Sequence, residues 1–292
     1  MNIQEIKQRT KSIKNTLQIT KAMELIASIK MRKAIEVAQT SREYSDRARA
    51  LLSRLAAEGK SYKHPLLASP NSKKSLLIIA SSDKGLCGSH NTEIFRASYK
   101  AIEEKKKGNQ EVDLIVIGNK ARNHFRRIKE LKIIADFETF GDSIEYLEAS
   151  PIAQLIIEEF SKGEYSEVNI VFRQFESMIR QNAQVIKILP LSAIRETQVG
   201  ANGRSPVHRY EFEPEPEKVL DSVLPQLVKV MVYQTLLENN ASEHAARMVA
   251  MKNASDAAGE IIQDLEFTFN RLRQERITSE ISEIASGAEA LS

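Results

Sequence analysis

The sequence predicts an α/β protein in which both termini form long helices that pair as an antiparallel coiled coil, with a Rossmann-like α/β domain inserted between them. Residues 1–58 contain neither proline nor glycine, and residues 226–292 contain no proline and two glycines, as long helices require. The segment between them holds short continuous apolar runs, the pattern of strands buried on both faces. We divide the chain into an N-terminal coiled-coil helix (1–59), an α/β domain with flanking linkers (60–209) and a C-terminal coiled-coil helix (210–292).

The N-terminal helix has an apolar side. Seven residues recur at helical spacing: Ile3, Ile6, Ile13, Leu17, Met23, Ile26 and Ile29. The stretch from Ala22 to Ile29 is apolar on nearly all sides.

The inserted domain alternates strands and helices. Apolar runs from Ser75, Val112 and Leu131 predict three strands, and residues 91–107 and 119–129 predict helices between them. A third helix is expected over 150–162, with Ser150 as its N-cap and Pro151 at its first position. Two further strands begin near Ser166 and Ala183, and the short polar turn between them predicts antiparallel pairing. This order is typical of a small α/β sandwich.

One glycine-containing turn is a candidate site. SSDKGLCG, residues 81–88, follows the first strand directly, where exposed backbone N–H groups could hold a phosphate. Its Gly-x-x-Gly spacing matches neither the dinucleotide fingerprint nor a P-loop. We therefore interpret Asp83, Gly85 and Gly88 as a structural turn capped by the aspartate. Cys87 with His90 three residues later is a weak hint of a nucleophile, and we expect no catalytic role.

Other chemistry is not indicated. The five histidines are scattered, and no His or Cys pair has the spacing of metal ligands, so we expect no metal and no cofactor. The basic residues Arg126, Arg127 and Lys129 lack an aromatic platform beside them, which favours a solvated face over a nucleic-acid site.

The C-terminal helix carries a narrow apolar seam that suits a coiled coil. Its members are Ile262, Leu265, Phe269, Leu272, Ile277, Ile281, Ile284, Ala288 and Leu291. Counted from Val219, the helix runs for roughly 70 residues, on the order of 100 Å. The seam changes phase at residues 273–276, where the N-terminal helix should be ending. We expect the apolar tail beyond that point to be buried in another protein.

Charge favours pairing of the two helices. Residues 1–60 carry 13 Lys and Arg against 6 Asp and Glu, whereas residues 210–292 carry 7 against 15. Opposite net charges favour association of the two helices over self-pairing of either. The alternative, two separate surface helices of one globular domain, stays open.

The amino-acid composition narrows the class of protein to which the chain can belong. A hydrophobic share of 42% with 28% charged residues is typical of a soluble protein, and a net charge of +3 is too small to indicate nucleic acid. The single cysteine excludes an internal disulfide. The longest wholly apolar run, Leu76–Ala80, is too short to span a bilayer, so we expect no direct membrane insertion.

Taken together, these segments resemble the gamma subunit of the bacterial F-type ATP synthase, the central rotor stalk, over essentially the whole chain. The motifs that carry the resemblance are ITKAMELIAS from Ile19, SSDKGLCG, ILPLS from Ile188, YEFEPEPEKVLDSVLPQL from Tyr210, ASEHAARMVAMKNASDAAGEII from Ala241 and FNRLRQERITSEISEIASGAEAL from Phe269. Lys84 stands where the family usually has Arg, and Glu275–Arg276 where it has small residues.

The resemblance implies a rotor shaft that is not itself catalytic. One copy would stand inside a ring of three alpha and three beta subunits, with the epsilon subunit and the membrane c-ring at its base, peripheral to the cytoplasmic side of the bacterial plasma membrane. Ion flow across the membrane would turn this shaft and drive ATP synthesis, or ATP hydrolysis would turn it and drive ion transport. The contacts it implies with alpha and beta are Met23, Arg247, Arg273, Gln274, Ile277, Ile281 and Ile284. Those it implies with the ring and epsilon are Tyr210 and Glu213.

Two other classes compete with this interpretation. An enzyme with a catalytic α/β domain would need a phosphate loop or an acid–base pair, for which SSDKGLCG is insufficient. A static coiled-coil scaffold would not need an unpaired apolar tail.

Overall fold

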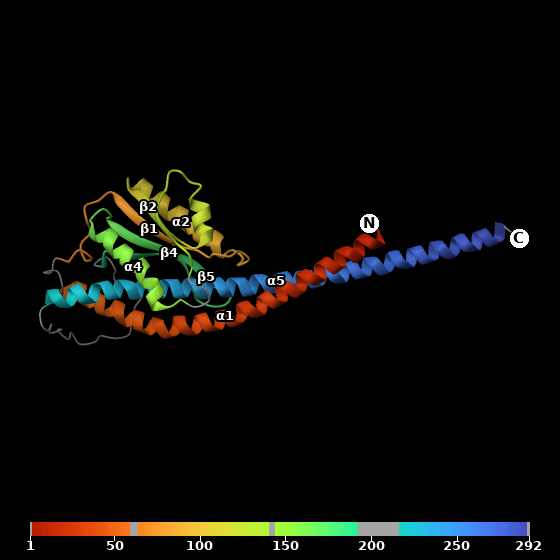
Figure 1. Ribbon diagram of the computed structural model, residues 1–292, viewed down its shortest axis with the longest axis horizontal. Coiled ribbons are helices and arrows are strands. Elements are labelled where there is room, and N and C mark those ends of the chain that lie inside the picture. Colours follow the sequence, from red (N-terminus) through yellow and green to blue (C-terminus); the bar gives the residue numbers. More distant parts are fainter. Residues whose placement is uncertain (1, 59–63, 140–143, 192–215, 291–292) are drawn as a thin grey trace. The chain divides into compact units, whose positions relative to one another are not determined.

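The computed structural model describes residues 2–58, 64–139, 144–191 and 216–290. It divides into two compact units, one formed by Met1–Ser28 with Arg247–Ser292 and the other by Ile29–Ala246. The predicted fold class is confirmed: the two longest helices are the first and last elements, and a sheet with its own helices lies between them in the chain (Figure 1).

The two terminal helices are the longest elements of the described structure. Helix α1 spans Ile3–Glu58 and helix α5 spans Pro216–Ala290, 56 and 75 residues. Helix α5 begins three residues before the expected Val219, with Pro216 at the first helical position, where a missing N–H costs no hydrogen bond. Pro225 lies inside α5, so the helix gives up one backbone bond there.

The five strands form one mixed sheet in the order β3-β2-β1-β4-β5. Their bounds are Lys74–Ala80 (β1), Glu111–Ile117 (β2), Lys132–Phe137 (β3), Glu167–Phe175 (β4) and Gln181–Leu189 (β5). Strands β1 to β4 pair in parallel, and β4 with β5 pair antiparallel, as predicted from the short turn between them. In the register, Leu77 lies opposite both Leu114 and Asn169.

Each face of the sheet has its own hydrophobic core. Helices α2 (His90–Lys107) and α3 (Asn119–Phe125) cover one face with residues such as Ile94 and Phe125, both fully buried. Helix α4 (Tyr146–Ser161) and the first part of α5 cover the other face, and their cores merge through residues such as Ile156 and Leu224 (Figure 1). Continuous apolar strands are buried on both sides because both faces are covered.

Two predicted helix bounds were wrong. Helix α4 begins at Tyr146, not at 150, because Glu145 and Glu148 form a capping box whose N-cap lies five residues before the expected Ser150 cap. Pro151 therefore lies inside α4 and not at its first position. Helix α3 ends at Phe125, four residues before the expected Lys129.

Within the described parts of the chain, none of the helices combines the length and the apolar character that crossing a bilayer demands.

Candidate functional site

The unit formed by residues 1–28 and 247–292 is built on a heptad seam. On α5 the buried residues Met251, Ser255, Ala258, Ile262 and Leu265 alternate at spacings of four and three, and the half-buried Phe269 and Leu272 continue the series. On α1, Ile6, Thr20 and Ala27 are buried at positions of one heptad series. This spacing is that of knobs-into-holes packing in a coiled coil.

Three contacts fix the antiparallel register of this pair. Ser255 Oγ donates a hydrogen bond of 2.8 Å to Thr20 Oγ1 in the buried seam. Further along, Lys14 Nζ lies 2.7 Å from Glu266 Oε1, and Lys7 Nζ lies 5.4 Å from the centroid of the Phe269 ring. The Lys14–Glu266 pair joins the basic helix to the acidic one, as the opposite net charges of the two segments predict. It is half-exposed on both sides, so it favours the correct partner more than it adds stability.

The hydroxyl pair leads to a stability prediction. Replacing Thr20 by the isosteric Val leaves the buried Ser255 hydroxyl without this partner, which we expect to cost about 1–3 kcal/mol of stability. The double variant T20V/S255A removes both polar groups, and we expect it to recover most of that loss. Thermal unfolding of the four chains measures the coupling, and additive losses would contradict a direct interaction.

Part of the apolar surface of α1 faces away from the seam. Ile19, Leu25 and Ile26 are 60%, 64% and 52% exposed, whereas Ala27 is buried and Met23 half-buried. The seam thus passes through a small residue and leaves larger ones outside, contrary to the expectation that Ile26 belonged to the pairing side. An exposed row of large aliphatic side chains on a helix marks a surface that a partner covers.

The end of α5 is wholly exposed. Every side chain from Arg273 to Ser286 is exposed, including Ile277 (47%), Ile281 (61%) and Ile284 (73%). Helix α1 begins at Ile3, one turn before the Lys7–Phe269 contact, so in the described structure α1 does not extend beside this tail. The predicted unpaired tail ran from Ile277 to Leu291, and its side chains are exposed as far as Ser286, the last one described. The tail is defined here as residues 273–286.

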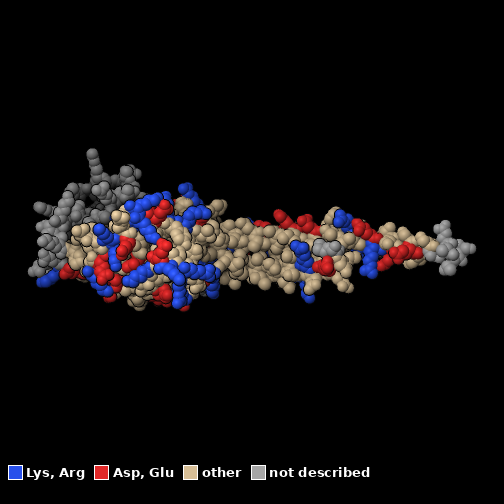
Figure 2. Space-filling model, turned by 90° about the horizontal axis from the view of Figure 1, so that it is seen from above, with Lys and Arg blue, Asp and Glu red and all other residues tan. Residues whose placement is uncertain are grey.

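Local charge pairs hold the tail helical without burying it. Arg276 Nε lies 2.9 Å from Glu280 Oε1, and Arg271 Nε lies 3.8 Å from Glu275 Oε1, both at i,i+4 spacing. Figure 2 shows acidic and basic groups alternating along this end of α5. The resemblance assigns Arg273, Gln274 and Arg247 to partner contacts; the first two are exposed here, and Arg247 is half-buried.

The turn after β1 is bonded to its own domain. Asp83 Oδ1 accepts a hydrogen bond of 2.8 Å from the backbone N–H of Asn119, at the start of α3. Asp83 Oδ2 accepts a 3.1 Å bond from the N–H of Thr139 and a short one from the Thr139 hydroxyl. Gly88 has a φ of +56°, which suits glycine, whereas a Cβ on Gly85 would make only ordinary contacts with Lys120. The carboxylate thus joins β1, α3 and the end of β3.

The Cys87 thiol lies within this turn. It is 2% exposed, and its Sγ atom lies 3.3 Å from Asn91 Nδ2 and 3.7 Å from Ser82 Oγ. The backbone N–H of His90 donates to the Cys87 carbonyl at 3.1 Å. In the described part of the chain, no group of three or more His, Cys, Asp or Glu side chains could hold a metal ion.

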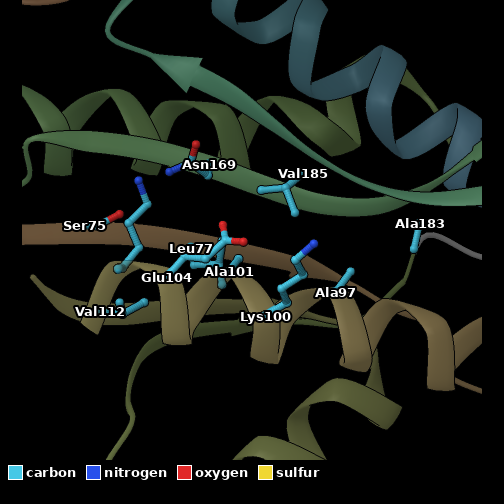
Figure 3. A pocket seen from close by; sticks show the side chains of 11 residues that line it. Ser75, Leu77, Ala97, Lys100, Ala101, Glu104, Val112, Asn169, Ala183 and Val185 are labelled. Atoms are coloured by element: carbon cyan, nitrogen blue, oxygen red, sulfur yellow. The ribbon is translucent and has the colours of Figure 1, made fainter. Parts of the chain in front are cut away.

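A polar slot of about 400 Å³ lies between α2 and the β4–β5 side of the sheet. Lys100 and Glu104 extend from α2 toward the strands, and Asn169 lies on the opposite side (Figure 3). Beside it, the buried Glu167 carboxylate binds both Lys105 and Lys187, the latter at 2.7 Å. The pKa of Lys105 is lowered, mainly by burial and further by the positive charge of Lys187. The residues lining the slot are charged, polar or apolar and include no His, Cys or Tyr.

Tyr210 and Glu213, which the resemblance assigns to contacts with the membrane ring and epsilon, lie outside the described residues.

The chain is similar to known proteins over its full length. A family model described as ATP synthase matches residues 2–291. An ATP synthase gamma chain of Pelotomaculum thermopropionicum is 40% identical, over 99% of each chain, and one of Nitrosococcus oceani is 39% identical, over 98% of each.

Solved structures resemble the fold. A chain of the central stalk/c-ring structure of Tetrahymena thermophila mitochondrial ATP synthase superposes with a TM-score of 0.60 at 25% identity, covering 81% of this chain and 99% of that one. A chain of the Euglena gracilis mitochondrial ATP synthase superposes with a TM-score of 0.67 at 16% identity, covering 99% and 94%.

Proposed function

This chain belongs to the gamma chain family of the ATP synthases, and we propose that it is the central rotor shaft that couples transmembrane ion flow to ATP synthesis or hydrolysis. The observation that carries the proposal is the exposed tail of α5. A helix that leaves Ile277, Ile281 and Ile284 in solvent beyond the end of its partner helix has an apolar surface suited to burial in another protein.

Membership of this family supports the partners that we propose. The paired helices of residues 1–28 and 247–292 stand inside a ring of three alpha and three beta subunits, one copy per complex. Met23, Arg247, Arg273 and Gln274 make contacts with that ring, together with the apolar residues of the tail. The exposed guanidinium of Arg273 can form charge-assisted hydrogen bonds that break and re-form as the shaft turns.

The shaft drives chemistry that it does not perform. Its two helices differ in sequence and charge, so each angular position presents a different surface to each surrounding site. A partner shifts a conformational equilibrium only if it binds the two conformations with different affinities. As the asymmetric shaft rotates, each catalytic site in turn meets a surface that favours a different conformation. The catalytic groups belong to the beta subunits, and this chain is the non-catalytic member.

The α/β domain and the base of the helix pair lie toward the membrane. Tyr210 and Glu213 precede α5 in the chain and contact the c-ring, and the epsilon subunit binds beside them. The complex is peripheral to the cytoplasmic side of the bacterial plasma membrane, in line with the bacterial relatives at about 40% identity. Asp83 acts structurally by joining β1, α3 and the end of β3, and Gly85 and Gly88 belong to the same structural turn.

Reconstitution tests the proposal. The purified chain is mixed with its alpha and beta subunits, and the product is analysed for mass and ATPase activity. We expect a single complex with one copy of this chain per six partners and an ATPase activity that depends on its presence. A chain that binds neither subunit, or that forms a homodimer with an activity of its own, would replace the rotor by an enzyme or a scaffold.

A further inference from the structure

A polar cluster lies where α1, α5 and β4 meet, within the unit of residues 29–246, and its α5 side chains are buried whereas Arg42 of α1 is partly exposed. Its centre is Glu238 on α5, which is 6% exposed. Glu238 Oε1 accepts hydrogen bonds from Arg42 Nη2 and Nε of α1, at 3.1 and 3.2 Å, and from Gln234 Nε2 at 3.1 Å. Gln234 Nε2 also lies 3.2 Å from the carbonyl oxygen of Ala38, so two separate contacts join α1 to α5.

The same cluster reaches the sheet. Arg42 Nη2 donates to the carbonyl oxygen of Phe175, the last residue of β4, at 3.4 Å. Asn239 Oδ1, next to Glu238 on α5, accepts from the backbone N–H of Arg173 at 3.1 Å. Both backbone groups lie beyond Val171, the last β4 residue paired with β1. Side chains of the two helices therefore bond the sheet where the β1 ladder has ended.

Stability alone does not explain this arrangement. The Glu238 side chain is 8% exposed and the Arg42 side chain 40% exposed, so the pair loses in desolvation of the carboxylate part of what it gains in attraction. Well-packed apolar residues can serve stability as well or better. Apolar packing is non-directional, whereas a hydrogen bond weakens steeply when its angle changes. The cluster thus adds what an apolar core lacks, namely resistance to rotation of the three elements about one another.

We propose that Arg42, Gln234, Glu238 and Asn239, named here the clamp, transmit torque between the sheet and the helix pair. The inference rests on the proposed rotor function, in which the α/β domain and the helices are driven from opposite ends. The clamp joins both helices to one strand through directional bonds, so twisting the sheet against the helices strains several bonds at once. The apolar core beside it resists separation, and the clamp resists twisting.

The test measures torsional stiffness in the assembled complex. The alpha–beta ring is fixed to a surface, and a bead is attached through E111C, whose native side chain is 77% exposed at the start of β2. Because Cys87 is buried, the introduced thiol is the accessible one. The angular variance of the bead during each pause is inversely proportional to the stiffness between the bead and the ring.

We expect E238A to raise that variance about twofold or more, since it removes the acceptor shared by Arg42 and Gln234. The matched control is E130A, which removes the exposed Lys106–Glu130 pair of the same domain and should leave the variance unchanged. N239A removes only the bond to β4 and should give a smaller increase. E238Q keeps the side-chain volume and an acceptor, and measures the contribution of the charge if E238A fails to fold.

Unchanged variance in E238Q, N239A and E238A alike would overturn the clamp, even with rotation intact. Equal increases in E130A and E238A would also overturn it, because the effect would then be a general softening. A wild-type complex that hydrolyses ATP without turning the bead would instead refute the rotor function, and with it the premise of the clamp. ATPase activity close to wild type in the clamp variants separates the two failures.

Discussion

Removal of residues 273–292 should strongly impair coupling while leaving the fold and the assembly intact. The described side chains of this segment are exposed, so their loss removes little buried surface, and the thermal midpoint of the isolated chain should hardly change. In the complex, the same residues bias the catalytic sites between states. Coupling free energies between sites correspond to factors of roughly 5–150, so ATP-driven ion transport should fall by on the order of tenfold or more.

Full-length variants show whether the loss comes from the apolar side chains of the tail or from the shortening of the helix. Replacing Ile277, Ile281 and Ile284 together by Ser removes the apolar row and should reproduce most of the loss. Replacing Thr278, Ser279 and Ser282 by Ala alters the same turns but not that row, and should leave transport close to wild type. Normal ion transport in the truncated complex would show that the tail is not a bearing surface.

A series of glycine substitutions should give the largest effects on stability. Gly118 has a φ of +92°, and a Cβ there would lie 2.6 Å from the carbonyl oxygen of Ser81 and 2.7 Å from its Oγ. Ser81 cannot easily yield, because its N–H donates to the carbonyl of Ile117 at 2.8 Å and its Oγ accepts from Ala121 N–H at 2.8 Å. We expect G118A to cost more than about 3 kcal/mol and to lower the thermal midpoint of the α/β domain sharply.

Two other glycines are the matched controls. Gly163 also has a positive φ, +78°, but a Cβ there would meet nothing within 4 Å, so G163A should cost only the backbone strain of about 1–2 kcal/mol. Gly259 lies within α5 with open space around it, so G259A should stabilise the helix by about 0.5–1 kcal/mol. Thermal unfolding of the isolated variant chains measures the order of their stabilities. Equal losses in G118A and G163A would show that the Ser81 contact is relieved by movement.

Much of the fold could be predicted because its signals are local. Ile262 and Leu265 mark the α5 seam in any helical plot, and both are buried. The apolar runs predicted the strands β1, β2 and β4, and the short turn after Phe175 predicted the antiparallel partner of β4. The unpaired tail followed from a difference in length between two helices, which needs no knowledge of side-chain packing.

The rest depended on small and polar residues, whose periodicity is weak. On α1 the buried seam runs through Thr20 and Ala27, whereas Ile26, a stronger signal, faces solvent. The clamp could not be predicted from a sequence pattern. Arg42 and Glu238 are ordinary charged residues that lie 196 positions apart in the sequence, and only the fold brings them into contact. The start of α4 was missed because Glu145 is an uncommon cap, and its pairing with Glu148 was the available signal.

The most direct test of the rotor is to watch it turn. The alpha–beta ring is fixed to a surface, a bead is bound to this chain through E111C, and ATP is added. We predict continuous rotation in one direction with three pauses per turn, at a rate that follows ATP concentration until product release limits it. A complex that hydrolyses ATP at its normal rate while the bead fluctuates about one fixed angle would contradict the account at its centre.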